Sequence, residues 1–227
     1  MEAKLVPKGI KPATLKNVVK FTNDLKARDK ILRLVQYYCK FLVYRLQASD
    51  PKSELAKRLN LLSKGISLHR KAFKFGAWVD EIQKFNELLE SGKSDLKQTL
   101  SLILRPVMAM FVLLDNMIYL ASLKVVLWDK DALKPKAYKV RLFAALLNTA
   151  TGYLDIEKQV KLVKAASPEE RSKAEEKQGQ LLVGMVKNVA DVVTYMNSAK
   201  YIEVNDGAIG LIGSASAAAA LYTIWCK

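Results

Sequence analysis

The chain is organised around the segment FTNDLKARDKILRLVQYYCKFLVYRLQ, residues 21–47. On a helix that turns about 100° per residue, it separates into two faces. One face gathers the apolar side chains of Phe21, Leu25, Leu32, Val35, Cys39, Leu42, Val43 and Leu46, flanked by Ile31 and Tyr38. The opposite face is basic, and Asp29 is its one acid between residues 26 and 47. The segment therefore predicts a long amphipathic helix.

This amphipathic helix has two interpretations. A helix that lies flat in a membrane interface places its apolar face among acyl chains and its lysines and arginines among head groups. A helix that packs on the core of a soluble bundle has the same wide apolar arc. Arg28 falls on the apolar side and Arg45 at its border, so both must lie near an end or extend outward along their aliphatic stems. Periodicity leaves both interpretations open.

The composition indicates an anionic partner. The chain of 227 residues is long enough for one large helical domain or two small ones, and its net charge is +15. Residues 1–123 hold 22 basic and 11 acidic residues, whereas residues 124–206 hold 14 and 11. Hydrophobic residues make up 51% of the chain, which indicates apolar blocks set among charged ones. A basic front half suits either nucleic acid or an anionic lipid surface.

Two segments are apolar enough to enter a bilayer. Residues 107–123 carry a single charge, Asp115, and form either a membrane-embedded helix that packs Asp115 against protein or a buried core helix. Residues 208–225, AIGLIGSASAAAALYTIW, carry no charge and form either a membrane segment or a buried Ala-rich core helix. The small residues of this last segment permit close helix contact, and its expected packing positions are Gly210, Gly213 and Ala217.

The other segments also follow helical spacing, and no strand pattern is convincing. In chain order we expect an irregular basic arm at residues 1–12, a short helix capped by Thr14, the main helix ending near Ala48, a helical pair or one bent helix over residues 52–90, and a helix over residues 136–166. The predicted fold class is all-α with six or seven helices: a helical membrane-associated protein with an N-terminal amphipathic helix and a C-terminal hydrophobic segment.

This organisation divides the chain into four regions. We expect a basic amphipathic helical region on the cytosolic face at residues 1–99, central hydrophobic helices at 100–166, a charged linker at 167–178, and a C-terminal helix plus a Gly/Ala-rich membrane segment at 179–227.

No catalytic or metal-binding pattern is evident. The one histidine, His69, has no second histidine, cysteine or acid pair at ligand spacing, and Cys39 and Cys226 stand far apart. The sequence has no phosphate-binding loop, dinucleotide fingerprint or nucleophile elbow. We therefore predict no enzyme, no metal site and no cofactor. No nucleic-acid-binding module is recognisable, and such a function leaves residues 208–225 unexplained.

Four blocks of the sequence resemble the peroxin-11 family of peroxisomal membrane-elongation proteins. In order, they are ARDKILRLVQYYCKFLVYRL (27–46), SKGISLHRKAFKFGAW (63–78), LLDNMIYLASLKVVLW (113–128) and GAIGLIGSASAAAALYTIW (207–225). Each block is a weak match alone. Their order along most of the chain makes the resemblance specific.

The resemblance implies a protein of the peroxisomal membrane, or of the glycosomal membrane if the source is a kinetoplastid. Its amphipathic helix would insert in the cytosolic leaflet and elongate the organelle before fission, so that peroxisomes proliferate. By position, the membrane-inserting face would be Ile31, Leu32, Val35, Cys39, Leu42 and Leu46, with Lys30, Arg33 and Lys40 toward lipid phosphates. The implied partners are an anionic phospholipid membrane, further copies of the chain, a fission adaptor and a dynamin-related GTPase, and no nucleic acid.

Two other functions stay open from the sequence. A peroxisomal membrane channel for small metabolites needs polar residues along a path between spans, and Asp115, Asn116 and Asn148 are the only mid-segment candidates. A soluble basic helical adaptor or nucleic-acid-binding protein would instead bury residues 208–225 in its core.

Overall fold

The computed structural model describes residues 12–92 and 95–226, and these residues form eight α-helices without a strand. The predicted all-α class is confirmed. The helices are α1 (Leu15–Asn23), α2 (Leu25–Ser49), α3 (Glu54–Ala72), α4 (Trp78–Glu90), α5 (Leu96–Ser122), α6 (Lys130–Ala165), α7 (Pro168–Ser198) and α8 (Asp206–Trp225). The basic arm expected at residues 1–12 lies, apart from Pro12, outside the described residues.

The amphipathic segment is divided between two helices. Thr14 caps α1 as predicted, because its side chain accepts a hydrogen bond from the backbone N–H of Asn17. Asp24 then ends α1 and caps α2, since its carboxylate accepts from the backbone N–H groups of Lys26 (2.6 Å) and Ala27 (3.0 Å). Phe21 therefore belongs to α1, and α2 carries the rest of the predicted helix.

The two longest helices, α6 and α7, each begin earlier in the chain than the sequence predicts. α6 begins at Lys130, before Pro135, because the Asp129 carboxylate caps its first turn. The charged residues expected to form a linker at 167–178 are instead helical, and α7 runs unbroken from Pro168 to Ser198. Gln159 of α6 donates from Nε2 to the Ala174 carbonyl (3.0 Å), which joins this part of α7 to α6.

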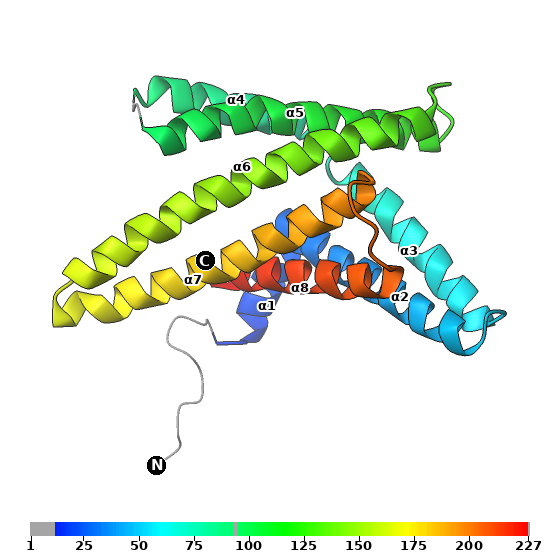
Figure 1. Cartoon of the computed structure of the whole chain (residues 1–227), viewed down its shortest axis with the longest axis horizontal. Coiled ribbons are helices and arrows are strands. Elements are labelled where there is room, and N and C mark those ends of the chain that lie inside the picture. Colours follow the sequence, from blue (N-terminus) through cyan, green and yellow to red (C-terminus); the bar gives the residue numbers. More distant parts are fainter. Residues whose placement is uncertain (1–11, 93–94, 227) are drawn as a thin grey trace, which may run out of the picture.

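The helices pack as a chain of neighbours that closes on itself. α3 packs on α2, α2 on α8, α8 on α7, α7 on α6 and α6 on α5, while α3 also touches α5. Figure 1 shows α6 and α7 as a long hairpin, with α4 and α5 above α6 and with α8 and α2 below α7. The amphipathic helix α2 and the hydrophobic helix α8, at opposite ends of the sequence, are thus neighbours.

Apolar side chains are distributed in an unusual way. The buried apolar clusters lie mainly between α5 and α6, around Phe111, Val112 and Leu147. Large apolar side chains are also exposed along the outer surfaces of α5, α6, α7 and α8, including Met110, Leu146, Tyr153, Val186 and Leu211. Extensive exposed apolar surface is rare on soluble monomers and marks a membrane or protein contact.

Two helices, α5 and α8, are long and apolar enough to cross a membrane. The two segments that the sequence singled out lie here: α5 holds residues 107–122 of the segment 107–123, and α8 holds all of 208–225. α5 extends further toward the N-terminus than predicted and contains Pro106.

Candidate functional site

The apolar stripe of α2 faces away from the bundle. Val35 and Tyr38 are 39% and 51% exposed, and Ile31, Leu32, Leu42 and Leu46 are half-buried. Cys39 differs from the other predicted inserting residues, because it is buried with 5% exposure. The stripe is therefore available to an external apolar phase, except at Cys39.

The opposite side of α2 packs antiparallel against α8. Gly207 lies against the Tyr44 ring, and a Cβ on Gly210 would lie 2.6 Å from the backbone nitrogen of Phe41. A Cβ on Gly213 would overlap the ring of Tyr37. Glycine is required at these positions because only a missing side chain permits this close approach.

The three predicted packing positions of α8 all lie in contact with other parts of the protein. Gly210 and Gly213 lie in the contact with α2, and Ala217 is completely buried. At the far end of α8, the rings of Phe21 and Trp225 meet edge to face with centroids 5.1 Å apart. These contacts hold the first half of α8 against α2 and its last turn against α1.

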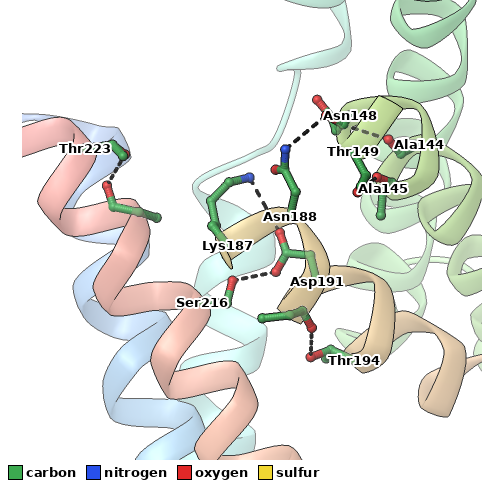
Figure 2. A network of polar contacts seen from close by, with 12 residues as sticks. Ala144, Ala145, Asn148, Thr149, Lys187, Asn188, Asp191, Thr194, Ser216 and Thr223 are labelled. Atoms are coloured by element: carbon green, nitrogen blue, oxygen red, sulfur yellow. Dashed lines mark hydrogen bonds and ion pairs between the residues drawn. The ribbon is translucent and has the colours of Figure 1, made fainter. Parts of the chain in front are cut away.

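The centre of the basic face of α2 is buried. Arg33 is 4% exposed and forms an ion pair with Asp191 of α7. Ser216 of α8 donates a hydrogen bond to the same carboxylate (2.6 Å), and the Lys187 ammonium lies 3.7 Å from it. Figure 2 shows the carboxylate of Asp191 between Lys187 and Ser216. Burial raises the pKa of Asp191, but Arg33 and Lys187 outweigh it and lower this pKa to about 2.

This placement corrects one sequence prediction. Arg33 was expected to contact lipid phosphates, but its guanidinium lies inside the bundle and already has a carboxylate partner. A helical wheel shows which face a residue occupies and does not show what covers that face.

The two other predicted phosphate contacts lie nearer the surface. Lys30 pairs with Asp29 (2.8 Å), whose carboxylate also accepts from Arg70 of α3 (2.9 Å). Lys40 pairs with Asp206 at the start of α8 (2.9 Å), and both side chains are partly exposed. Lys30 and Lys40 therefore have acidic partners, as Arg33 does. Unlike Arg33, they reach solvent.

The mid-segment polar residues do not share one cavity. Asp115 is 5% exposed and pairs with Lys71 and with Lys74 (3.9 Å). Asn148 lies elsewhere, beside a cavity of about 380 Å³ between α6 and α7, and its carbonyl accepts from Asn188 (3.0 Å, Figure 2). Asp115 and the buried Asn116 are not among the described residues that line this cavity.

Lys74 occupies a crowded position near these acids. Burial lowers the pKa of Lys74 to about 8, although Asp29 and Asp115 act in the opposite direction. His69, the one histidine, lies within hydrogen-bond distance of the Gly65 carbonyl on its own helix. Within the described ranges, no group of three or more His, Cys, Asp or Glu side chains is placed to hold a metal ion.

Sequence reasoning missed the role of Asp191 and Ser216. Both lie in mainly apolar helical stretches, VADVVTYM and IGSASAAAA, in which Asp191 is the one charged residue. An acid in an apolar helical stretch is itself a signal, because a buried carboxylate requires a cationic partner. Asp191 could therefore have been predicted to form a buried ion pair.

Buried ion pairs, an apolar outer surface and two helices long enough to cross a bilayer are features found in α-helical membrane proteins. The family described as "Peroxisomal biogenesis factor 11 (PEX11)" matches residues 15–225, and the chain belongs to this family. It is therefore a protein of the peroxisomal membrane, as the resemblance implied.

Curated relatives agree with this assignment. The chain is 26% identical to human "Peroxisomal membrane protein 11A" over 234 residues, which covers 90% of the chain and 94% of the relative. It is 24% identical to "Peroxisomal biogenesis factor 11" of Schizosaccharomyces pombe, with 92% and 94% covered, and 22% identical to the bovine protein 11A, with 91% and 94% covered. No solved structure matches the chain.

Proposed function

We propose that this protein elongates the peroxisomal membrane by inserting the apolar stripe of α2 into the cytosolic leaflet. The observation that carries the proposal is the outward direction of this stripe, with Val35 and Tyr38 exposed while Arg33 lies inside the bundle. A soluble bundle would have the opposite arrangement. A helix buried shallowly in one leaflet expands that leaflet alone, and the membrane bends toward a tubule.

Helix α8, which packs on α2, is part of the same proposal. Separating α2 from α8 would expose the glycine–aromatic contacts and take Arg33 of α2 away from the Asp191 carboxylate, to which Ser216 of α8 also donates. We therefore propose that α2 and α8 lie together along the cytosolic leaflet. Lys30 and Lys40, which reach solvent, would meet lipid phosphates at the edge of the pair. Arg33 would hold α2 on α7 and would not contact lipid.

Self-association and recruitment of a fission adaptor and a dynamin-related GTPase complete the proposed function. They follow from the family resemblance. Elongation supplies the narrow membrane on which a fission machinery of this kind would act.

The test uses the full chain on vesicles that contain anionic phospholipid. Val35→Glu with Leu42→Glu places two charges on the stripe, and we expect tubulation seen by electron microscopy to be lost. Leu61→Glu with Leu89→Glu is the matched control, because these leucines are exposed on α3 and α4. Circular dichroism verifies the helix content of both variants. Undiminished tubules with the stripe variant would contradict leaflet insertion by α2.

A further inference from the structure

A pocket of about 490 Å³ lies where α1, the start of α2 and the end of α8 meet. Phe21, Ile224 and Trp225 form its apolar wall, and Lys20 and Lys26 form its basic wall. Figure 1 shows α1 near the C-terminal end of α8. A pocket with one apolar and one basic wall suits an amphiphilic ligand that carries negative charge.

The two lysines of this pocket are available for a ligand. Within residues 12–92 and 95–226, neither Lys20 nor Lys26 has an ion-pair partner, in contrast to Lys30 and Lys40. Asp24, the one acid among the described lining residues, directs its carboxylate to the backbone N–H groups at the start of α2. The pocket therefore has a surplus of positive charge.

The apolar wall of the pocket lies at the C-terminal end of α8. Ile224 and Trp225 end an apolar helix of 20 residues, so the wall continues into the hydrophobic surface of α8. A tryptophan at the end of such a helix is typical of the head-group level of a membrane. A ligand bound here would have its charged part at the lysines and its apolar part along α8.

We propose that this pocket binds the head group of an anionic glycerophospholipid. Lys20 and Lys26 hold the phosphate, and the acyl chains leave past Ile224 and Trp225. Free phosphate would use the lysines alone and would not explain the apolar wall. The site requires only that the chain resides in the peroxisomal membrane, so it does not rest on leaflet insertion by α2.

The test measures lipid binding by the full chain in detergent micelles, where there is no bilayer to bend. Native mass spectrometry counts bound dioleoylphosphatidylglycerol on the delipidated protein. The pocket variant is Lys20→Ala with Lys26→Ala. The matched control is Lys16→Ala with Lys64→Ala, which removes the same charge from exposed positions outside the described lining. Circular dichroism verifies that both variants are folded.

We expect one bound lipid on the wild type and on the control, and an affinity about tenfold lower for the pocket variant. Dioleoylphosphatidylcholine, with the same chains and no net charge, should also bind about tenfold more weakly. Val35→Glu with Leu42→Glu should bind normally, which separates this site from the α2 stripe. Equal loss in both lysine pairs, equal binding of the two lipids, or displacement of the lipid by inorganic phosphate would overturn the proposal.

Discussion

Arg33 of α2 and Asp191 of α7, 158 positions apart in the chain, form a buried ion pair whose carboxylate also accepts a hydrogen bond from Ser216 of α8. One carboxylate therefore joins three helices. This contact holds α2 with the centre of its basic face inward and its apolar stripe outward, which is the orientation that leaflet insertion requires.

Arg33→Met should strongly destabilise the folded chain, because it leaves Asp191 without its closest cation. The expected loss is about 3–5 kcal/mol of unfolding free energy, which is typical for one partner of a buried pair. Unfolding in detergent micelles, followed by circular dichroism, measures this loss. Arg33→Met combined with Asp191→Leu removes both charges and should recover much of the stability. If the single variant is as stable as the wild type, the pair does not hold α2 in place.

Gly210→Ala should weaken the contact between α2 and α8. Its Cβ would lie 2.6 Å from the Phe41 backbone, which has no flexible end that can move aside. We expect a loss of about 1–3 kcal/mol in the same unfolding experiment. Gly184→Ala is the control, because no atom lies within 4 Å of the added Cβ and alanine favours the helix by up to about 1 kcal/mol. Equal stability changes in the two variants would show that the close approach is unimportant.

Because the pKa of Lys74 is lowered in the folded chain, we expect the unfolding free energy to rise with pH. Burial lowers its pKa to about 8 in the folded chain, whereas the unfolded chain keeps the ordinary value of 10.5. Between these values the unfolded state binds more protons, so the unfolding free energy increases as the pH rises. The gain between roughly pH 7.5 and 9.5 is at most about 2 kcal/mol, because the side chain is partly exposed.

The measurement compares the pH dependence of unfolding in the wild type with that in Lys74→Met. The variant cannot titrate at this position, so its stability should rise less over the same range. Parallel pH curves for the two proteins would show that Lys74 titrates normally in the folded chain.

Much of the fold could be predicted because local signals agreed with tertiary packing. Thr14 and the Ser167–Pro168 start of α7 are local capping signals, and both mark helix beginnings in the structure. The break at Asp24 was missed because the apolar period continues across it from Phe21 to Leu25. The charged residues after Pro168 were read as a linker, although glutamate and lysine are good helix formers.

The candidate site was less predictable from sequence. The apolar stripe of α2 follows from its period, but its direction depends on what covers the other face. That cover consists mainly of α8 and α3, and Asp191 of α7 reaches Arg33 from far along the sequence. Cys39 shows the same limit, because it lies on the predicted stripe and is nevertheless buried.

The inclination of α2 in the membrane distinguishes shallow insertion in one leaflet from a helix that crosses the bilayer. Single spin labels at residues 31, 35, 42 and 46 of the full chain, reconstituted in anionic vesicles with the native cysteines replaced, report depth along one stripe that is about 22 Å long. If α2 inserts in the leaflet, we expect similar shallow depths in one leaflet at all four positions. A steady change in depth along the series, passing through the bilayer centre, would show that α2 crosses the membrane beside α8 and would contradict the wedge mechanism.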